Sequence, residues 1–196
     1  MKKQLLIILT LVMLLVLVVQ PAAAKTILAN YTGTAGNNDY KGSSKSEVIR
    51  GLGGNDDLSG EGGNDTISGG NGADVLDGGS GNDSINGGNG KDKIYGDSGA
   101  DTLNGANGND LINGDSGNDY ISGGEGKDKI RGGSGNDVIY GDAGNDTIYG
   151  NEGNDRIYGG EGVDIINGGP GYDVCHVGSG EKKVFECELI YRYAGQ

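Results

Sequence analysis

Apolar side chains recur along most of this chain at a spacing of nine residues. From position 58 to position 166 every ninth residue is Leu or Ile, whereas the residues between them are mostly Gly, Asp, Asn and Ser. In a stretch such as Val138-Ile139-Tyr140, the central side chain of a strand would face one way and its two neighbours the other. Ile occupies ten of these thirteen positions, and β-branched side chains favour strands. The pattern therefore predicts an all-β protein of short strands joined by six-residue turns.

Glycine and aspartate keep the same phase as the apolar residues. Residues 51–176 divide into fourteen consecutive nonapeptides, each with Gly at its first and fourth positions and Asp at its sixth. A chain with 43 glycines among 196 residues indicates disorder when the glycines are aperiodic and a repeat architecture when their period is fixed. The turns need positive φ angles, which glycine adopts readily. Where the second position lacks Gly, the residues include four that tolerate such angles, namely Asp97, Asp115, Asp142 and Asn151.

Two degenerate units precede this array and fill residues 33–50. They retain part of the glycine pattern but have Asn38 and Glu47 where Asp is expected. The terminal units of a stacked array cover its ends and therefore differ from the inner units. We expect residues 25–50 to form an N-terminal cap that contains these two degenerate repeats.

Residues 1–24 have the layout of a secretory signal peptide. Lys2 and Lys3 precede an apolar run over residues 5–19, and small residues up to Ala24 provide a cleavage site. An uncleaved membrane anchor is the alternative, but a run of fifteen residues is shorter than the roughly 20 that span a bilayer. We expect cleavage after Ala24 and a secreted, extracellular protein.

The period stops after residue 176, and residues 177–196 contain a cluster of apolar side chains. We expect this segment to form a C-terminal cap over the last turn rather than a binding site. Cys175 and Cys187 are the only cysteines, and they lie close together in a chain that we expect to be exported. A disulfide between them would attach the cap to the last repeat.

The charge of the chain limits its partners. Cleavage would remove two of the 15 basic residues, leaving 13 against 28 acidic residues and a formal charge of -15. Such a chain repels nucleic acid and anionic lipid and attracts cations, so we expect no nucleic-acid partner and no membrane insertion. Because it is also poor in aromatic residues, it is a weak candidate for folding unaided.

The nonapeptides follow a known consensus. Residues 78–86 (GGSGNDSIN) and 132–140 (GGSGNDVIY) match the pattern G-G-x-G-x-D-x-U-x at every fixed position. The chain thus resembles the RTX, or hemolysin-type calcium-binding, repeat family over nearly its whole mature length. This resemblance implies a right-handed parallel β-roll, a solenoid of stacked 18-residue turns with calcium between successive loops on each edge. The implied ligands are the sixth-position aspartates, in two columns of seven: Asp56, Asp74, Asp92, Asp110, Asp128, Asp146 and Asp164 on one edge, and Asp65, Asp83, Asp101, Asp119, Asp137, Asp155 and Asp173 on the other.

Stacking these carboxylates creates a need for cations. Successive turns would lie about 4.8 Å apart, so neighbouring carboxylates would repel by roughly 1 kcal/mol even with the screening of bulk water. Calcium bound by carboxylate and carbonyl oxygens would convert this repulsion into a cross-link, and it suits irregular all-oxygen sites better than magnesium. Seven loops on each edge leave six gaps, which predicts on the order of 12 ions. Asn38 and Glu47 are weaker ligand candidates.

A solvated acidic surface is the alternative interpretation of the aspartates. Such a surface would accept Glu, Ser or Asn at the sixth position, where Asp is invariant, while the seventh position varies freely. Asn at the fifth position in eight units is interpreted as loop-forming rather than metal-binding. His176, the only histidine, follows Tyr140 and Tyr158 at regular intervals of two nonapeptides, which predicts an aromatic ladder on an outer sheet face rather than a catalytic group.

These observations predict a secreted calcium-binding repeat protein that folds on binding several calcium ions and has an extracellular structural or surface-associated role. The alternative is a calcium-dependent interaction module that presents a repetitive face, including the serine row Ser80, Ser98, Ser116 and Ser134, to a glycan, a cell surface or ice. An enzyme is not expected, because the sequence lacks the HExxH motif of RTX metalloproteases and any separate catalytic region.

Overall fold

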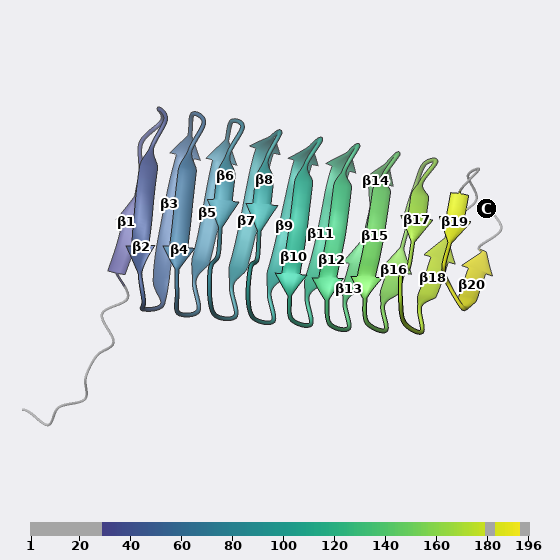
Figure 1. The fold of residues 1–196 in the computed structure, drawn as a ribbon. Coiled ribbons are helices and arrows are strands. Elements are labelled where there is room, and N and C mark those ends of the chain that lie inside the picture. Colours follow the sequence, from purple (N-terminus) through teal and green to yellow (C-terminus); the bar gives the residue numbers. More distant parts are fainter. Residues whose placement is uncertain (1–28, 179–182, 193–196) are drawn as a thin grey trace, which may run out of the picture.

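The computed structural model describes residues 29–178 and 183–192, which form a solenoid of parallel strands without a helix (Figure 1). About nine coils of about 18 residues stack along one axis. The sequence-based prediction of an all-β solenoid with 18-residue turns is therefore confirmed. The signal peptide predicted for residues 1–24 lies outside the described residues and stays a prediction.

The strands belong to two sheets that form opposite walls of the solenoid. The first sheet contains β1 (Ala29–Thr32), β3 (Glu47–Gly53), β5 (Thr66–Asn71), β7 (Ser84–Gly90), β9 (Thr102–Gly108), β11 (Tyr120–Gly126), β13 (Val138–Tyr140), β16 (Arg156–Tyr158), β18 (Val174–Val177) and β20 (Leu189–Arg192), with β14 (Ala143–Gly144) also paired to β11. The second contains β2 (Asp39–Ser43), β4 (Asp57–Glu61), β6 (Val75–Asp77), β8 (Lys93–Tyr95), β10 (Leu111–Ser116), β12 (Lys129–Ser134), β15 (Thr147–Glu152), β17 (Ile165–Asn167) and β19 (Lys183–Phe185).

Residues one coil apart face each other across each parallel pair. Ile85 of β7 pairs with Leu103 of β9, which lies two nonapeptides further along the chain. The same separation continues along both sheets until the last pair of the first sheet, in which Val174 pairs with Leu189 rather than with Arg192. Each coil therefore consists of two nonapeptides, and the final coil is shorter by three residues.

The core is a double column of the periodic aliphatic side chains. Each is at most 2% exposed: Ile49, Leu58, Ile67, Leu76, Ile85, Ile94, Leu103, Ile112, Ile121, Ile130, Ile139, Ile148, Ile157 and Ile166. At the N-terminal end Tyr31 and Tyr40 pack against this column, with ring centroids 4.1 Å apart. At the C-terminal end Val184 and Cys187 pack against it. Residues on both sides of the periodic array thus cover its ends.

Several strands extend beyond the predicted three residues. β7, for example, continues through the first four positions of the next nonapeptide. There the coils lie so close that a Cβ atom on Gly126, at φ +140°, would be 1.4 Å from the carbonyl oxygen of Gly108. Positive φ angles also occur at the second position, between 65° and 72° at the four predicted Asp and Asn residues, and in addition at Leu52, Glu61 and Ala106. The last three were not expected, because their side chains do not favour this conformation.

An aromatic ladder lies on the outer face of the first sheet. Ring centroids are 4.6 Å apart between Tyr140 and Tyr158 and 4.4 Å apart between Tyr158 and His176, in nearly parallel planes. The predicted ladder is therefore confirmed. The structure lengthens it at both ends, because Tyr191 stacks on His176 at 4.9 Å and Tyr120 lies 5.4 Å from Tyr140.

Candidate metal centre

The sixth-position aspartates are buried at the turns between the two sheets. All fourteen are at most 3% exposed, although each carries a carboxylate. One carboxylate oxygen of each aspartate is used to join two coils. The backbone N–H of Asp101, for example, donates to Oδ1 of Asp119, in the next coil, at 2.9 Å. The same bond recurs along both edges, which places the aspartates in the two expected columns.

The second carboxylate oxygen has no protein partner at thirteen of these aspartates. This buried Oδ2 atom accepts no hydrogen bond in Asp56, Asp65, Asp74, Asp83, Asp92, Asp101, Asp110, Asp119, Asp128, Asp137, Asp146, Asp155 and Asp173. A buried acceptor without a partner costs roughly 1–3 kcal/mol, and more when it is charged. The array thus repeats an unfavourable feature that a bound cation would remove.

In most units, this Oδ2 oxygen and a backbone carbonyl oxygen of the next coil both lie close to the first-position glycine. The place where Gly132 would carry a Cβ atom is 2.2 Å from Oδ2 of Asp137 and 2.7 Å from the carbonyl oxygen of Gly150 in the next coil. The first position must be glycine because these oxygens occupy that space. The same arrangement recurs, for example, at Gly69, with Asp74 Oδ2 at 2.3 Å and the next coil's carbonyl at 2.7 Å. The cation argument rests on the Oδ2 atoms themselves, because unpaired carboxylate oxygens are the ligands that a hard cation prefers.

Burial makes the ionised form of these carboxylates unfavourable. Desolvation raises the pKa of Asp101, Asp137 and Asp146 to about 7, while the backbone N–H bonded to each lowers it part of the way and neighbouring carboxylates raise it again. The pKa of Asp92 and Asp128 is raised to about 6 by the same causes. A divalent cation would offset this cost by bonding the ionised form.

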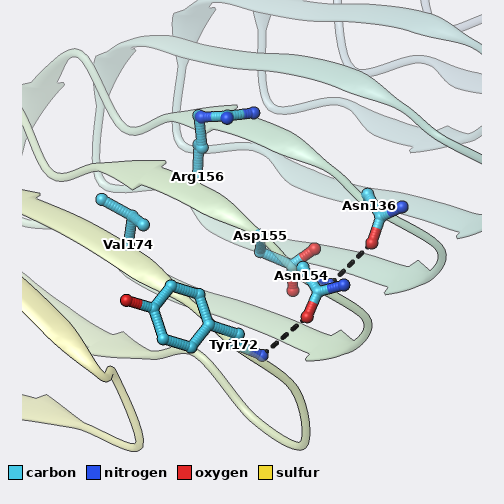
Figure 2. A pocket seen from close by; sticks show the side chains of 6 residues that line it. All are labelled: Asn136, Asn154, Asp155, Arg156, Tyr172 and Val174. Carbon is cyan, nitrogen blue, oxygen red and sulfur yellow. Dashed lines mark hydrogen bonds between the residues drawn. The ribbon is translucent and has the colours of Figure 1, made fainter.

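Asparagines at the fifth position form a second ladder, which runs in the opposite direction. Oδ1 of Asn136 accepts the N–H of Asn154 at 2.8 Å, and Oδ1 of Asn154 accepts the N–H of Tyr172 at 2.8 Å (Figure 2). Each asparagine therefore bonds the coil that follows it, whereas each aspartate bonds the coil that precedes it. The interpretation of these asparagines as loop-forming is supported, because their oxygens are used by backbone N–H groups.

The two degenerate N-terminal units place different side chains in the same position. The N–H groups of Asn38 and Glu47 donate to Oδ1 of the aspartates one coil later, as an inner aspartate would, at 2.7 Å each. Their own side-chain oxygens, however, are already bonded. Oδ1 of Asn38 accepts the N–H of Thr34 at 3.0 Å, and Oε1 of Glu47 accepts the hydroxyl of Ser43 at 2.6 Å. These units satisfy their polar atoms without a cation.

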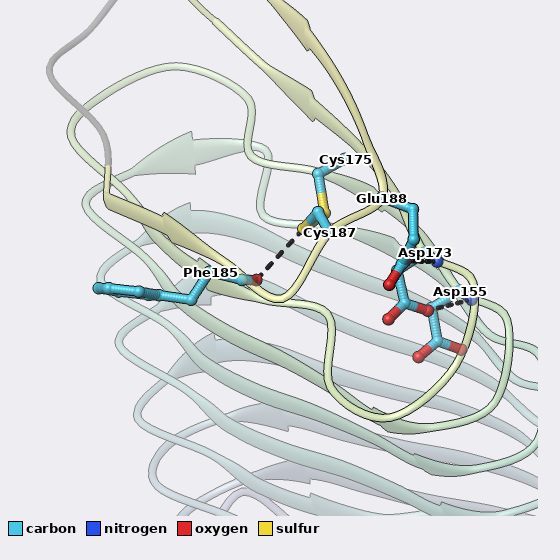
Figure 3. Close-up of a disulfide and its surroundings, with 6 residues drawn as sticks. All are labelled: Asp155, Asp173, Cys175, Phe185, Cys187 and Glu188. Atoms are coloured by element: carbon cyan, nitrogen blue, oxygen red, sulfur yellow. Dashed lines mark hydrogen bonds between the residues drawn. A yellow bond between two sulfur atoms is a disulfide. The ribbon is translucent and has the colours of Figure 1, made fainter.

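Glu188 completes one aspartate column at the C-terminal end. Its Oε2 atom accepts the N–H of Asp173 at 2.5 Å, the bond that an aspartate of a further coil would make (Figure 3). Beside it, Cys175 and Cys187 form a disulfide, as expected from the sequence. Sequence reasoning missed Glu188, because the loop is three residues shorter than the period requires. Its position directly after a cysteine that pairs with the last repeat was the available signal.

Among the described residues no group of three or more His, Cys, Asp or Glu side chains gathers as a metal site. The unpaired Oδ2 atoms recur instead along the two aspartate columns. The same residues include no helix that is long and apolar enough to cross a membrane.

Comparison with known proteins identifies the repeat. A family model, the RTX calcium-binding nonapeptide repeat, matches in four consecutive copies over residues 32–67, 68–103, 104–139 and 140–175. No curated protein sequence matches the chain. The matched segments run without a gap through the region in which the buried aspartates lie. The protein therefore belongs to the RTX family of calcium-binding repeat proteins.

Proposed function

We propose that this protein is a secreted, multi-site calcium-binding solenoid that folds when calcium binds and serves as an extracellular structural or surface-associated element. The observation that carries the proposal is the row of buried Oδ2 atoms that lack a hydrogen-bond donor. The ligands would be the fourteen sixth-position aspartates of the two columns, together with loop carbonyl oxygens. When bound, calcium supplies positive charge that cross-links successive loops.

The columns define how many ions the protein holds. Six gaps separate the seven aspartate loops on each edge, so we expect on the order of 12 ions. Ions bound by Asn38 or Glu47 are not expected, because hydrogen bonds already use the side-chain oxygens of these residues. Asp173 is different, since Glu188 bonds only its N–H group and leaves its Oδ2 atom without a donor.

Folding and calcium binding are coupled in this proposal. The core contains one aliphatic side chain per nonapeptide, so each coil buries little apolar surface. The same coil buries two carboxylates whose ionised forms are disfavoured by desolvation. Calcium binds the loops of the folded protein and not those of the unfolded chain, so its binding free energy contributes to folding.

Two observations and one physical argument support an extracellular location. Residues 1–24 have the layout of a signal peptide. The cysteines form a disulfide, a bond that persists in oxidising compartments. Millimolar extracellular calcium would fill sites that cytosolic calcium would leave empty. No catalytic role is proposed, because the single histidine lies in the aromatic ladder, where burial lowers its pKa.

The serine row gives little support to the alternative role in binding a glycan, a cell surface or ice. The hydroxyl of Ser116 donates to the carbonyl oxygen of Asp97 at 3.1 Å, and that of Ser80 to Glu61 at 3.4 Å. These hydroxyls therefore serve the loop backbone. The alternative role stays a prediction.

Circular dichroism and ion counting test the proposal together. In chelator the protein should lack most of its β-signal, and roughly 2–10 mM calcium should restore it, with on the order of 12 ions retained per chain. Magnesium at the same concentration is the control and should restore little, because it requires near-octahedral sites. A spectrum that calcium leaves unchanged, or one that magnesium restores equally well, would contradict the proposal.

A further inference from the structure

Four lysines gather around one pocket on the edge that carries Asp92 and Asp110. Lys91 and Lys93 lie on one coil, and Lys127 and Lys129 lie two coils later at the same positions of the repeat. Together with Asn109 and Leu111 of the coil between them, these residues line a pocket of about 490 Å³. All four lysines are exposed. The cluster is unusual in a chain with 15 basic and 28 acidic residues.

The pocket, which we call the lysine groove, lies between the fifth-position side chains Lys91, Asn109 and Lys127 and the seventh-position side chains Lys93, Leu111 and Lys129. Its counterpart on the opposite edge is a pocket of about 330 Å³ lined by Asn136, Asn154, Tyr172, Val174 and one basic residue, Arg156 (Figure 2). Nearer the C-terminus on the lysine-bearing edge, Val163, Ile165 and Lys183 line a third pocket. Basic charge therefore concentrates in one stretch of one edge, although the backbone of both edges is alike.

Calcium changes the charge around these lysines. After cleavage the formal charge of the chain is -15, and about 12 divalent ions would add about 24 charges, giving roughly +9. Asp92 and Asp110, which lie beneath the groove, would then be neutralised. This step rests on the proposed function. Before calcium binds, the acidic chain repels polyanions; afterwards the lysines are held at fixed spacing in a positive field.

We propose that this groove binds an acidic polysaccharide chain, and that it does so only in the calcium-loaded protein. The two lysine pairs are two strand spacings apart, or about 9.6 Å. This spacing lets the two pairs contact separate acid groups of one extended polymer. The residues that line the pocket include no aromatic side chain on which a nucleic-acid base would stack, which favours a polysaccharide.

The residues between the lysines suit a sugar. Leu111 is a half-buried residue of the pocket lining and offers apolar contact to the C–H face of a ring. Asn109 uses its Oδ1 atom to accept the N–H of Lys127 at 2.7 Å, so its amide is held in place with its NH₂ group as a donor to hydroxyl or carboxylate oxygens. Lysine ammonium groups act as point charges that tolerate different acid groups, carboxylate or sulfate.

The test compares two variants with equal loss of charge. One combines Lys91→Gln, Lys93→Gln, Lys127→Gln and Lys129→Gln. The matched control combines Lys41→Gln, Lys45→Gln, Arg50→Gln and Arg156→Gln, four exposed basic residues outside the pocket. Binding of fluorescently labelled polygalacturonate and dextran sulfate is measured at fixed free calcium and fixed ionic strength. Neutral dextran and duplex DNA are the reference polymers, and circular dichroism with ion counting verifies that each variant is folded.

The wild-type protein and the matched control should bind an acidic polysaccharide in calcium, and the four-lysine variant should bind at least tenfold more weakly. Preference between polygalacturonate and dextran sulfate identifies the acid group. Equal weakening in both variants, equal binding in chelator, binding of DNA without polysaccharide, or no binding by the folded protein would each overturn the inference. In these cases normal calcium-induced folding leaves the proposed function standing. Failure of calcium to fold the wild-type protein would overturn both.

Discussion

The two N-terminal units and the fourteen inner units have the same backbone arrangement but different chemistry at one position. In the first two, a side-chain oxygen lies where the inner units place Oδ2 of aspartate, and it accepts a hydrogen bond from the backbone N–H of Thr34 or Ser43. In thirteen of the inner units the corresponding oxygen is buried without a donor. The difference teaches that loop shape alone does not require an ion. The requirement arises where a carboxylate is buried against the next coil and nothing within the chain donates to it.

Close stacking of the coils gives the largest expected effect of a single substitution. Gly126→Ala would place a methyl group 1.4 Å from the carbonyl oxygen of Gly108 at a φ of +140°. We expect a loss of at least about 4 kcal/mol in the calcium-loaded protein, because a steric clash and backbone strain add. Gly36→Ala is the matched control, since its nearest contact would be Thr34 Oγ1 at 3.9 Å. Thermal unfolding measures both, and similar melting temperatures would contradict the expectation.

The number of bound ions depends on the aspartates at the centre of each column. Asp110→Asn with Asp119→Asn removes one carboxylate from the centre of each column, and each carboxylate borders two gaps. We expect the number of bound ions to fall from about 12 to about 8 and the calcium midpoint for folding to rise. Glu47→Gln should leave the ion count unchanged, because Ser43 already bonds this side chain. Atomic emission after desalting counts the ions. An equal count in the wild-type protein, the double variant and Glu47→Gln would contradict the assignment of the aspartates as ligands.

At the C-terminal end, the disulfide and Glu188 are expected to stabilise the last coil without a cation. Reduction of the Cys175–Cys187 disulfide, which closes a short loop, should cost about 3 kcal/mol of local stability. The loss should appear in β18 and β20, where Glu188 is held beside Asp173. Hydrogen exchange before and after reduction locates the effect. Faster exchange in β1 and β3 as well would show that the cap governs the whole stack.

Lowering the pH should have the smallest effect. Protons neutralise the buried carboxylates, as calcium would, but they do not cross-link the loops. The raised pKa values, about 6 at Asp92 and about 7 at Asp101 and Asp137, mean that the folded arrangement without metal binds more protons than the unfolded chain. Protonation of these aspartates therefore contributes stability to the folded, metal-free protein. This contribution is fully present below the ordinary pKa near 4 and is lost as the pH rises through 6 to 7. In calcium-free buffer we expect β-signal to increase from pH 7.5 to pH 5. An unchanged signal would contradict this.

The sequence predicted the repeating parts of the molecule well. A nine-residue phase of Ile and Leu defines a core column, because only a periodic fold can bury every ninth side chain. The same phase predicted where the aspartates and the ladder of Tyr140, Tyr158 and His176 would lie. Each of these features depends on spacing alone, which the sequence states directly. Whether calcium occupies the aspartate loops stays a prediction.

The features that were not predicted depend on contacts between residues whose separation does not follow the nine-residue period. Glu188 reaches Asp173 across a shortened loop, and no period indicates that distance. Leu52 adopts a φ of 80°, a conformation that its side chain does not favour and that its residue type does not predict. The lysine pocket was also missed. Net charge describes the whole chain, whereas the pocket requires knowing that the fifth-position and seventh-position side chains line one groove.

The separation of two nonapeptides between paired positions has a consequence for evolution. A duplication of one nonapeptide would exchange the two edges for everything that follows, moving the lysine groove to the opposite side and placing the shortened C-terminal loop over the wrong column. A duplication of two nonapeptides inserts a complete coil and leaves every edge and both ends matched. The length of such a protein can therefore change freely between relatives, but in steps of two repeats, and each step adds a proportional demand for calcium.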